Sequence, residues 1–386
     1  MNIKHSEHAA TTLSAPGRWR ALTSVLVVSA LAWTLAACGG STPSSDPDPD
    51  PTSTATTAAP EPSATETDAD GLPTGLDPQP LAERTTIVVG LAVTSEAFLP
   101  VMVAEWFGEF EKENLDVEIE VAPDPASTIP LLDQGRLDVA ATGPFAGLLN
   151  VQAEGSEVRW ITGMGEAQTS PTSGGYYQRL PEDGSDPDPC ALEGKRIGLV
   201  GTWTSSAALN LLKYLDQCDL GPDDVDVTTL DTTLAPEALR SGSVEMAYTL
   251  EPHTVQVVED GIATQVVINP NGLGGFAAGS MINENPEAIQ AFVRAMVRAS
   301  QTYLQGDYRE NPELLAHIAE WLGADEETIL KSQHRLFDPY LSTDDLASLM
   351  EQLQPFWIEI GDILEFDTPL PVDQLVDNRF TDNTAK

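Results

Sequence analysis

The chain has 386 residues and a formal net charge of −41, from 60 acidic and 19 basic residues. A chain this acidic is repelled by other polyanions, which excludes nucleic acid and anionic lipid surfaces as partner classes. The charge is explained as a solubility adaptation, for example to high salt. An acidic site for a polycation is the alternative.

The first 37 residues have the layout of a secretory signal. Lys4, Arg18 and Arg20 make a basic start, and an apolar run from Ala21 to Ala37 ends at Cys38. As a helix this run would span roughly 25 Å, at the short limit for crossing a bilayer, so a permanent transmembrane anchor is the alternative.

The end of this run, Leu35-Ala36-Ala37-Cys38, resembles a bacterial lipobox, in which the cysteine is lipidated and becomes the new N-terminus. The resemblance implies that residues 1–37 are removed and that Cys38 anchors the chain to the outer face of the cell membrane. Residues 38–82 are rich in Ser, Thr, Pro and acids, so we predict a disordered linker that contains the lipidated cysteine.

Two cysteines remain after lipidation of Cys38, namely Cys190 and Cys218. An exported pair in an oxidising compartment usually forms a disulfide, and this one would contribute roughly 3 kcal/mol on the chain-entropy model. Its predicted role is structural.

The stretch from Glu83 to Lys386 is longer than one typical core and predicts two lobes. Strand and helix patterns alternate along it, which is typical of parallel-rich α/β sheets flanked by helices. We expect lobe 1 to comprise 83–180 and 270–386 and lobe 2 to comprise 190–268, with hinge crossings near 178–189 and 269–275. The predicted strands are 86–90, 117–121, 137–141, 195–200, 225–230, 244–248 and 276–281; the predicted helices are 99–110, 129–134, 205–217, 236–241, 286–304, 312–322 and 343–360.

Polar residues follow the predicted strands of both lobes. Ligands of open parallel sheets bind beyond the carboxyl ends of the strands, where helix N-termini offer free amide groups. The predicted ligand-binding residues are Ser95, Glu96, Thr142, Gly143, Thr202, Trp203, Thr204, Ser205, Ser206, Thr249 and Glu251. For Ser205 or Ser206 the alternative is an ordinary helix cap, and for Trp203 it is a residue of the core or of lobe packing.

Three acids, Glu96, Glu166 and Glu251, are expected near the cleft. The four loops that follow the strands, which we call the strand-end loops, contain no Lys or Arg; they are 95–96, 142–145, 202–206 and 249–252. An anion would therefore have to rest on neutral donors. A solute with a positive or hydrogen-bond-donating group fits better, although an acid near a helix N-terminus can also complement the helix dipole.

Signatures of catalysis and of metal binding are absent from the sequence, including Gly-x-Ser-x-Gly, His-Glu-x-x-His, Cys-x-x-Cys and a phosphate-binding loop. We therefore predict no catalytic residue, no metal and no cofactor. The alternative is a Ser205 or Ser206 nucleophile activated by His253; a histidine of a helix surface or hinge is the simpler reading.

Three segments resemble the solute-binding components of ABC importers for nitrate, taurine, alkanesulfonates and thiamine-pyrimidine precursors. They are Ala191-Leu192-Glu193-Gly194-Lys195-Arg196-Ile197-Gly198, Leu239-Arg240-Ser241-Gly242-Ser243-Val244-Glu245-Met246-Ala247 with Glu251-Pro252, and Gly135-Arg136-Leu137-Asp138-Val139-Ala140. Family members often carry an aromatic residue before Glu-Pro, where this chain has Leu250.

This resemblance implies a two-lobed, type II periplasmic-binding-protein fold whose cleft closes on a small-molecule solute without chemistry. It implies an ABC permease as partner, a membrane attachment through the N-terminal lipid, and a monomer. The alternatives are an exported enzyme on the same fold and a sensor subunit that presents the solute to a signalling partner.

Overall fold

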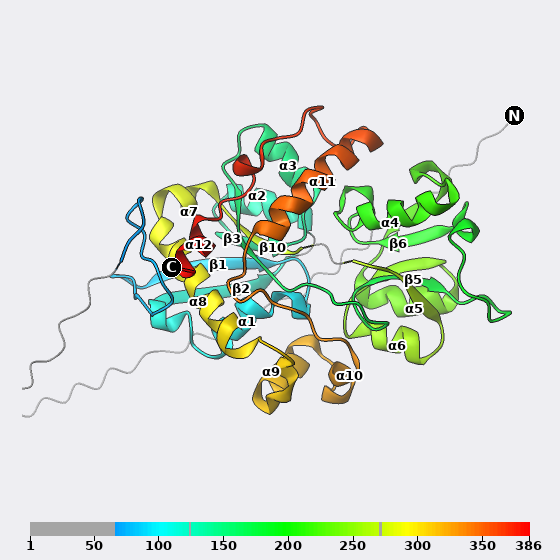
Figure 1. The fold of residues 1–386 in the computed structure, drawn as a ribbon, viewed down its shortest axis with the longest axis horizontal. Helices are drawn as coiled ribbons and strands as arrows, with labels where there is room; N and C mark the ends of the chain where they lie inside the picture. The colour runs from blue at the N-terminus through cyan, green and yellow to red at the C-terminus, as the bar shows by residue number, and fades with distance from the viewer. Residues whose placement is uncertain (1–65, 123–124, 270–271) are drawn as a thin grey trace, which may run out of the picture. The chain divides into compact units, whose positions relative to one another are not determined.

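The computed structural model describes residues 66–122, 125–269 and 272–386, which form two five-stranded sheets (Figure 1). The predicted signal peptide and the predicted lipidation site, Cys38, lie outside these residues. Within the described ranges, no helix combines the length and the apolar character needed to cross a membrane.

The first sheet has the strand order β2-β1-β3-β10-β4. The β-branched run of β1 is buried and pairs in parallel with β2 and β3, whereas β10 is antiparallel to β3 and to β4. The strands are β1 (Thr85–Leu91), β2 (Leu115–Val121), β3 (Val139–Thr142), β4 (Arg159–Gly163) and β10 (Gly274–Ala277).

The second sheet repeats this plan with the order β7-β6-β8-β5-β9. β6 pairs in parallel with β7 and β8, and β5 is antiparallel to β8 and β9. The strands are β5 (Gly175–Arg179), β6 (Arg196–Leu199), β7 (Asp226–Thr229), β8 (Met246–Thr249) and β9 (Ala263–Ile268). Both sheets therefore bring the carboxyl ends of three parallel strands to one edge.

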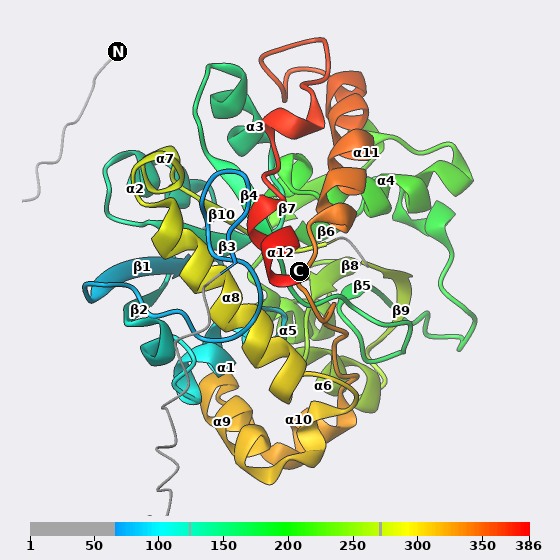
Figure 2. The ribbon, with the colours of Figure 1, turned by 60° about the vertical axis from the view of Figure 1, so that its left-hand side comes forward.

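Helices cover both sheets. In Figure 2, α8 runs across the first sheet with α1 and α12 beside it, and α8 contacts both of them. The helices that follow strands of the first sheet are α1 (Leu99–Trp106), α2 (Thr128–Asp133), α3 (Ala146–Ala153), α7 (Gly279–Glu284) and α8 (Pro286–Tyr303), and the later ones are α9 (Pro312–Leu322), α10 (Glu326–Lys331), α11 (Asp344–Ile360) and α12 (Arg379–Thr384). The second sheet has α4 (Ala208–Leu215) on one side and α5 (Ala235–Ser241) and α6 (His253–Glu259) on the other.

One predicted boundary between the lobes is wrong. We expected lobe 1 to continue to residue 180, but β5 belongs to the second sheet. The first crossing therefore lies at 164–174, between β4 and β5, and not at 178–189. The physical reason is long-range pairing: β5 forms a strand by pairing with β8 and β9, which come much later in the sequence, and no local pattern reports this.

The predicted disordered linker also ends earlier than expected, because residues 66–82 are folded. Leu72 is buried, Gly75 N donates to Asn383 O at 2.8 Å, and Leu81 N donates to Glu113 O at 2.9 Å. The polar composition hid these contacts, which depend on a few apolar residues and on backbone hydrogen bonds. In Figure 2 this segment lies against α8 and α12.

The predicted secondary structure is correct for most long elements and fails at short ones. The predicted strand 276–281 is divided between β10 and α7, and the predicted helix 205–217 begins only at Ala208. Cys190 and Cys218 form the predicted disulfide, with Cα atoms 5.2 Å apart.

Candidate functional site

The predicted site residues occupy the strand ends, as expected. Ser95 and Glu96 follow β1, Thr142 ends β3, and Thr249 ends β8. Thr202–Thr204 form a 3-10 turn after β6. All are therefore at the carboxyl edges of the two sheets.

The strand-end loops at 143–145 and 202–206 contact each other directly. Ser205 pairs with Phe145 in an antiparallel bridge, and Ser206 N donates to Pro144 O at 3.0 Å. A Cβ on Gly143 would lie 3.1 Å from Leu273 Cδ2 and 3.3 Å from Ser206 Oγ, so glycine permits this approach. Predicted residues of the two sheets, Gly143 and Ser206, are thus brought together here.

Four of the predicted hydroxyl groups form hydrogen bonds with backbone atoms. Ser95 Oγ accepts a hydrogen bond from Ala97 N at 3.2 Å, Ser205 Oγ accepts one from Ala207 N at 3.3 Å, and Thr249 Oγ1 donates to Thr232 O at 2.9 Å. Thr204 Oγ1 donates to Gly201 O. Ser205 does not cap α4, since the N-cap of that helix is Ala207 and has no side-chain capping bond, and solute binding by these hydroxyls stays a prediction.

Trp203 lies where the second sheet meets a helix of the C-terminal segment. Its side chain is half-buried against the core, and its carbonyl oxygen accepts a hydrogen bond from Trp357 Nε1 in α11 at 2.9 Å. The lobe-packing role considered for Trp203 is thus supported by a direct contact.

We expect Trp357→Phe to lower the free energy of unfolding by about 1–2 kcal/mol, because it removes the donor to a partly buried carbonyl and leaves a smaller ring in the core. Urea denaturation measures this. The matched control is Trp321→Phe in α9, whose half-buried ring stacks edge-on against Trp106. Equal losses in the two variants would argue against a specific contribution from the Trp203–Trp357 contact.

A buried ionic network connects the two predicted glutamates. Glu251 accepts a hydrogen bond from Arg335 Nη2 at 2.9 Å and one from Gly174 N at 2.6 Å. Tyr308 donates its hydroxyl proton to Glu96, and the Tyr308 hydroxyl oxygen accepts from Arg335 N at 3.2 Å. We call Glu96, Glu251, Tyr308 and Arg335 the strand-end network.

Two buried polar atoms of this network have no partner among the described residues. They are Glu96 Oε1, an acceptor, and Arg335 Nε, a donor. Burial raises the pKa of Glu96 to about 7, against the hydrogen bond from Tyr308, and the charge of Glu251 raises it further. Buried polar atoms normally have a partner, so these two atoms have unused hydrogen-bonding capacity.

Sequence reasoning missed Arg335 and Tyr308. The four strand-end loops contain no Lys or Arg, as noted, but Arg335 reaches Glu251 from between α10 and α11, so a cationic side chain does lie at the strand ends. Arg335 and Glu251 are 84 positions apart in the sequence. No periodicity or motif marks Arg335, so no signal could have found it.

The third predicted acid, Glu166, lies beside the network. Its backbone pairs with Leu336, the residue after Arg335, and its carboxyl group shares a hydrogen bond with Asp345. Burial raises the pKa of Glu166 to about 7, and Asp345 adds to this shift. Glu166 thus joins the first crossing to the C-terminal segment.

His253 makes no hydrogen bond with Ser205, one of the two serines considered for it. It begins α6, half-buried, where burial lowers its pKa and the charge of Asp231 opposes the shift. Ser205 Oγ is engaged with Ala207 N instead. The geometry therefore gives no support to a Ser205–His253 pair.

The protein has the fold of periplasmic binding proteins, because two sheets of the same strand plan are joined by crossing segments. Solved structures agree with this fold. The alkanesulfonate-binding protein SsuA of Xanthomonas axonopodis pv. citri, bound to MOPS, has a TM-score of 0.59 at 16% identity and covers 76% of this chain and 99% of its own. The nitrate-binding protein NrtA of Synechocystis PCC 6803 has a TM-score of 0.53 at 14% identity, with 78% and 93% covered.

The family follows from the sequence comparison. A family model described as NMT1/THI5 like matches residues 95–307, more than half of the chain, so this chain belongs to the NMT1/THI5-like family.

Two curated relatives and one further structural neighbour are enzymes. The chain is 24% identical over 225 residues to the 4-amino-5-hydroxymethyl-2-methylpyrimidine phosphate synthase of Aspergillus parasiticus, covering 53% of this chain and 62% of that protein. The synthase of Candida albicans is 25% identical over 224 residues, with 53% and 63% covered. The chain thus spans about three fifths of these relatives. The desulfurization enzyme DSZB shares the fold, with a TM-score of 0.54 at 17% identity and with 78% of this chain and 99% of its own covered.

Proposed function

We propose that this chain is a lipid-anchored, extracytoplasmic solute-binding protein that delivers a small molecule to an ABC permease without chemistry. The observation that carries the proposal is the strand-end network, in which Glu96 of the first sheet and Glu251 of the second are linked through Tyr308 and Arg335. A solute there would contact both sheets at once.

Access to this network requires movement of the two sheets. Glu96 is fully buried and Glu251 is 2% exposed, so a solute reaches them only when the contacts around the crossings open. Solute capture by opening and closing of two lobes is a common mode of hinge motion. It fits a receptor whose closed form is read by a permease.

The chemistry of the network favours a solute with N–H donors. Glu96 Oε1 is an unpartnered acceptor, and Arg335 is already neutralised by Glu251. An aminopyrimidine offers an amino group to Glu96 and a ring nitrogen to Arg335 Nε, and the names of the curated relatives point to the same class. Alkanesulfonate and nitrate, bound by structural neighbours, lack such donors.

Native mass spectrometry of the chain from Pro62 onward, purified without denaturation, tests for a co-purified solute. Calorimetry then measures binding of 4-amino-5-hydroxymethyl-2-methylpyrimidine, MOPS and nitrate. At pH 8, where Glu96 is ionised, we expect the aminopyrimidine to bind and Glu96→Gln to weaken its binding by roughly 10- to 100-fold, because a charge-assisted hydrogen bond contributes about 1.5–3 kcal/mol. The exposed Glu118→Gln is the control. Binding of none of the three compounds, with no co-purified mass, would count against the receptor.

An exported enzyme is the second candidate, because the curated relatives are synthases and DSZB is an enzyme of this fold. The same panel, incubated with the protein and followed by mass spectrometry, distinguishes the two. Turnover that is lost in His253→Ala would establish the enzyme, whereas binding without a change of solute mass supports the receptor. A sensor subunit would bind the solute equally well but would associate with a signalling partner instead of a permease.

A further inference from the structure

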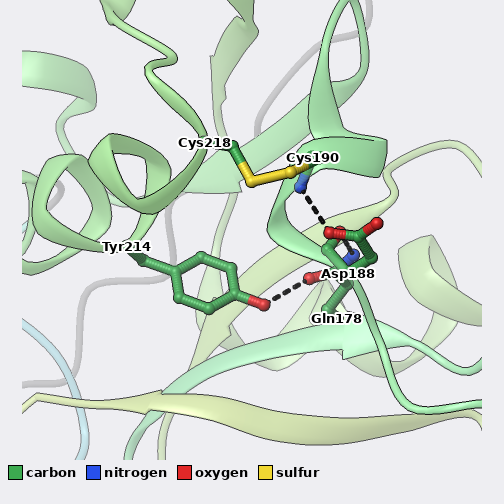
Figure 3. Close-up of a disulfide and its surroundings, with 5 residues drawn as sticks. All are labelled: Gln178, Asp188, Cys190, Tyr214 and Cys218. Atoms are coloured by element: carbon green, nitrogen blue, oxygen red, sulfur yellow. Dashed lines mark hydrogen bonds between the residues drawn. A yellow bond between two sulfur atoms is a disulfide. The ribbon is translucent and has the colours of Figure 1, made fainter.

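The disulfide of the second sheet lies beside a carboxylate. The side-chain oxygen of Asp188 and the sulfur atoms of Cys190 and Cys218 all lie within 4.8 Å of one another (Figure 3). This is the one group with metal-ligand proximity in the part of the chain that the structure describes. Asp188 and Cys190 are exposed and Cys218 is half-buried, so solvent and ions can reach them.

Asp188 is held by hydrogen bonds as well as by the neighbouring disulfide. Gln178, which is 2% exposed, donates from Nε2 to Asp188 O at 2.9 Å, and Tyr214 donates its hydroxyl proton to Gln178 Oε1 at 2.9 Å (Figure 3). Cys190 N donates to Asp188 Oδ1 at 2.9 Å. The 188–190 turn is thus attached to β5 through Gln178, which Tyr214 of α4 orients, in addition to the disulfide.

From this arrangement we propose that the reduced form of the protein binds a thiophilic divalent cation, with Zn²⁺ as the best fit, through Cys190, Cys218 and Asp188. Two thiolates and a carboxylate are three of the four ligands that tetrahedral Zn²⁺ takes, and the fourth position stays open to water. The Cα atoms of the cysteines, 5.2 Å apart, allow both sulfurs to reach one ion. This site is separate from the strand-end network and does not rest on the proposed transport function.

The chemistry requires a dithiol reductant. Exchange with the dithiol breaks the Cys190–Cys218 bond, forms a disulfide in the reductant and leaves two protein thiols. Binding of the cation then displaces the two thiol protons, since only thiolates ligate the metal. The oxidised protein lacks two of the three ligands, so the disulfide and the metal exclude each other.

The test uses the folded chain from Pro62 onward, either oxidised or reduced with dithiothreitol and desalted without oxygen. Each form is titrated with Co²⁺, whose thiolate complexes give a charge-transfer absorption band, and then with Zn²⁺ against a chromophoric chelator. We expect one equivalent to bind to the reduced form and none to the oxidised form, which has the same acidic surface.

Variants test the three ligands. Cys190→Ser with Cys218→Ser should abolish binding, and Asp188→Asn should weaken it about tenfold or more while keeping the hydrogen bond from Cys190 N. Asp186→Asn, an exposed neighbour, is the matched control. Equal affinities of Asp188→Asn and Asp186→Asn would overturn the role of the carboxylate.

Circular dichroism of the reduced protein completes the test. A reduced protein that keeps its fold but binds no stoichiometric metal overturns the proposal, and so does one that loses its fold, because the site needs the native 188–190 turn. Retention of fold together with one bound equivalent supports it.

Discussion

Replacing Arg335 by methionine is expected to lower the free energy of unfolding by about 3–5 kcal/mol, because Glu251 is left as a buried, unpaired charge. The two side chains are 4% and 1% exposed, and their atoms are 2.9 Å apart. Arg335 Nη1 also donates to Gly165 O at 3.3 Å, in the first crossing. Urea denaturation of the purified chain measures the loss.

Two companion variants separate the charge effect from packing. Adding Glu251→Gln to Arg335→Met removes the stranded charge while Gly174 N keeps an acceptor, so part of the lost stability should return. Arg196→Met breaks an ion pair with Asp226 whose partners are 57% and 58% exposed, and it should cost less than about 1 kcal/mol. If Arg335→Met lowers the free energy of unfolding no more than Arg196→Met does, the buried ion pair stabilises the protein no more than the exposed one.

The second large effect is a change in the pH dependence of stability in Glu96→Gln. Burial raises the pKa of Glu96 from 4.5 to about 7. Between these values the unfolded chain has ionised Glu96 while the folded chain still holds the proton. Stability from this group is therefore fully present below pH 4.5 and is lost as the pH rises to about 7, by about 3 kcal/mol at most.

Glutamine cannot ionise, so Glu96→Gln should unfold with nearly the same free energy as the parent chain near pH 4.5 and be more stable than it by about 2–3 kcal/mol at pH 8. Urea titrations at a series of pH values measure the two curves. Glu118→Gln, on the exposed face of β2, should follow the parent chain throughout. Parallel curves for Glu96→Gln and the parent would show that Glu96 ionises normally in the folded state. Glu166, whose pKa is also raised, remains in both proteins and leaves a residual slope.

Local sequence patterns predicted correctly those helices and strands whose own residues specify the secondary structure. The helix predicted at 312–322 is α9 residue for residue, and the β-branched run at 86–90 lies within β1. Asn311 caps α9 and Pro312 begins it, which are ordinary start signals in the sequence.

Patterns failed where the partner determines the structure. β5, with the sequence Gly-Tyr-Tyr-Gln-Arg, is a strand because it pairs with β8 on one side and with β9 on the other. The site shows the same limit: the strand-end residues could be predicted from their positions after strands, but Arg335 reaches Glu251 only through the path of the folded chain. A single sequence contains no distance information of this kind.

The pairing at the two crossings has a consequence for how this architecture could have arisen. Gly163 at the end of β4 lies opposite Gly274 of β10, and Gly175 at the start of β5 lies opposite Ile268 of β9. The chain therefore leaves the first sheet and returns to it through neighbouring strands, and the second sheet also begins and ends on neighbours. Residues 175–268 are therefore a contiguous insert in topological terms: a gene segment inserted at one point of a single-sheet protein would produce this arrangement without disturbing any other strand.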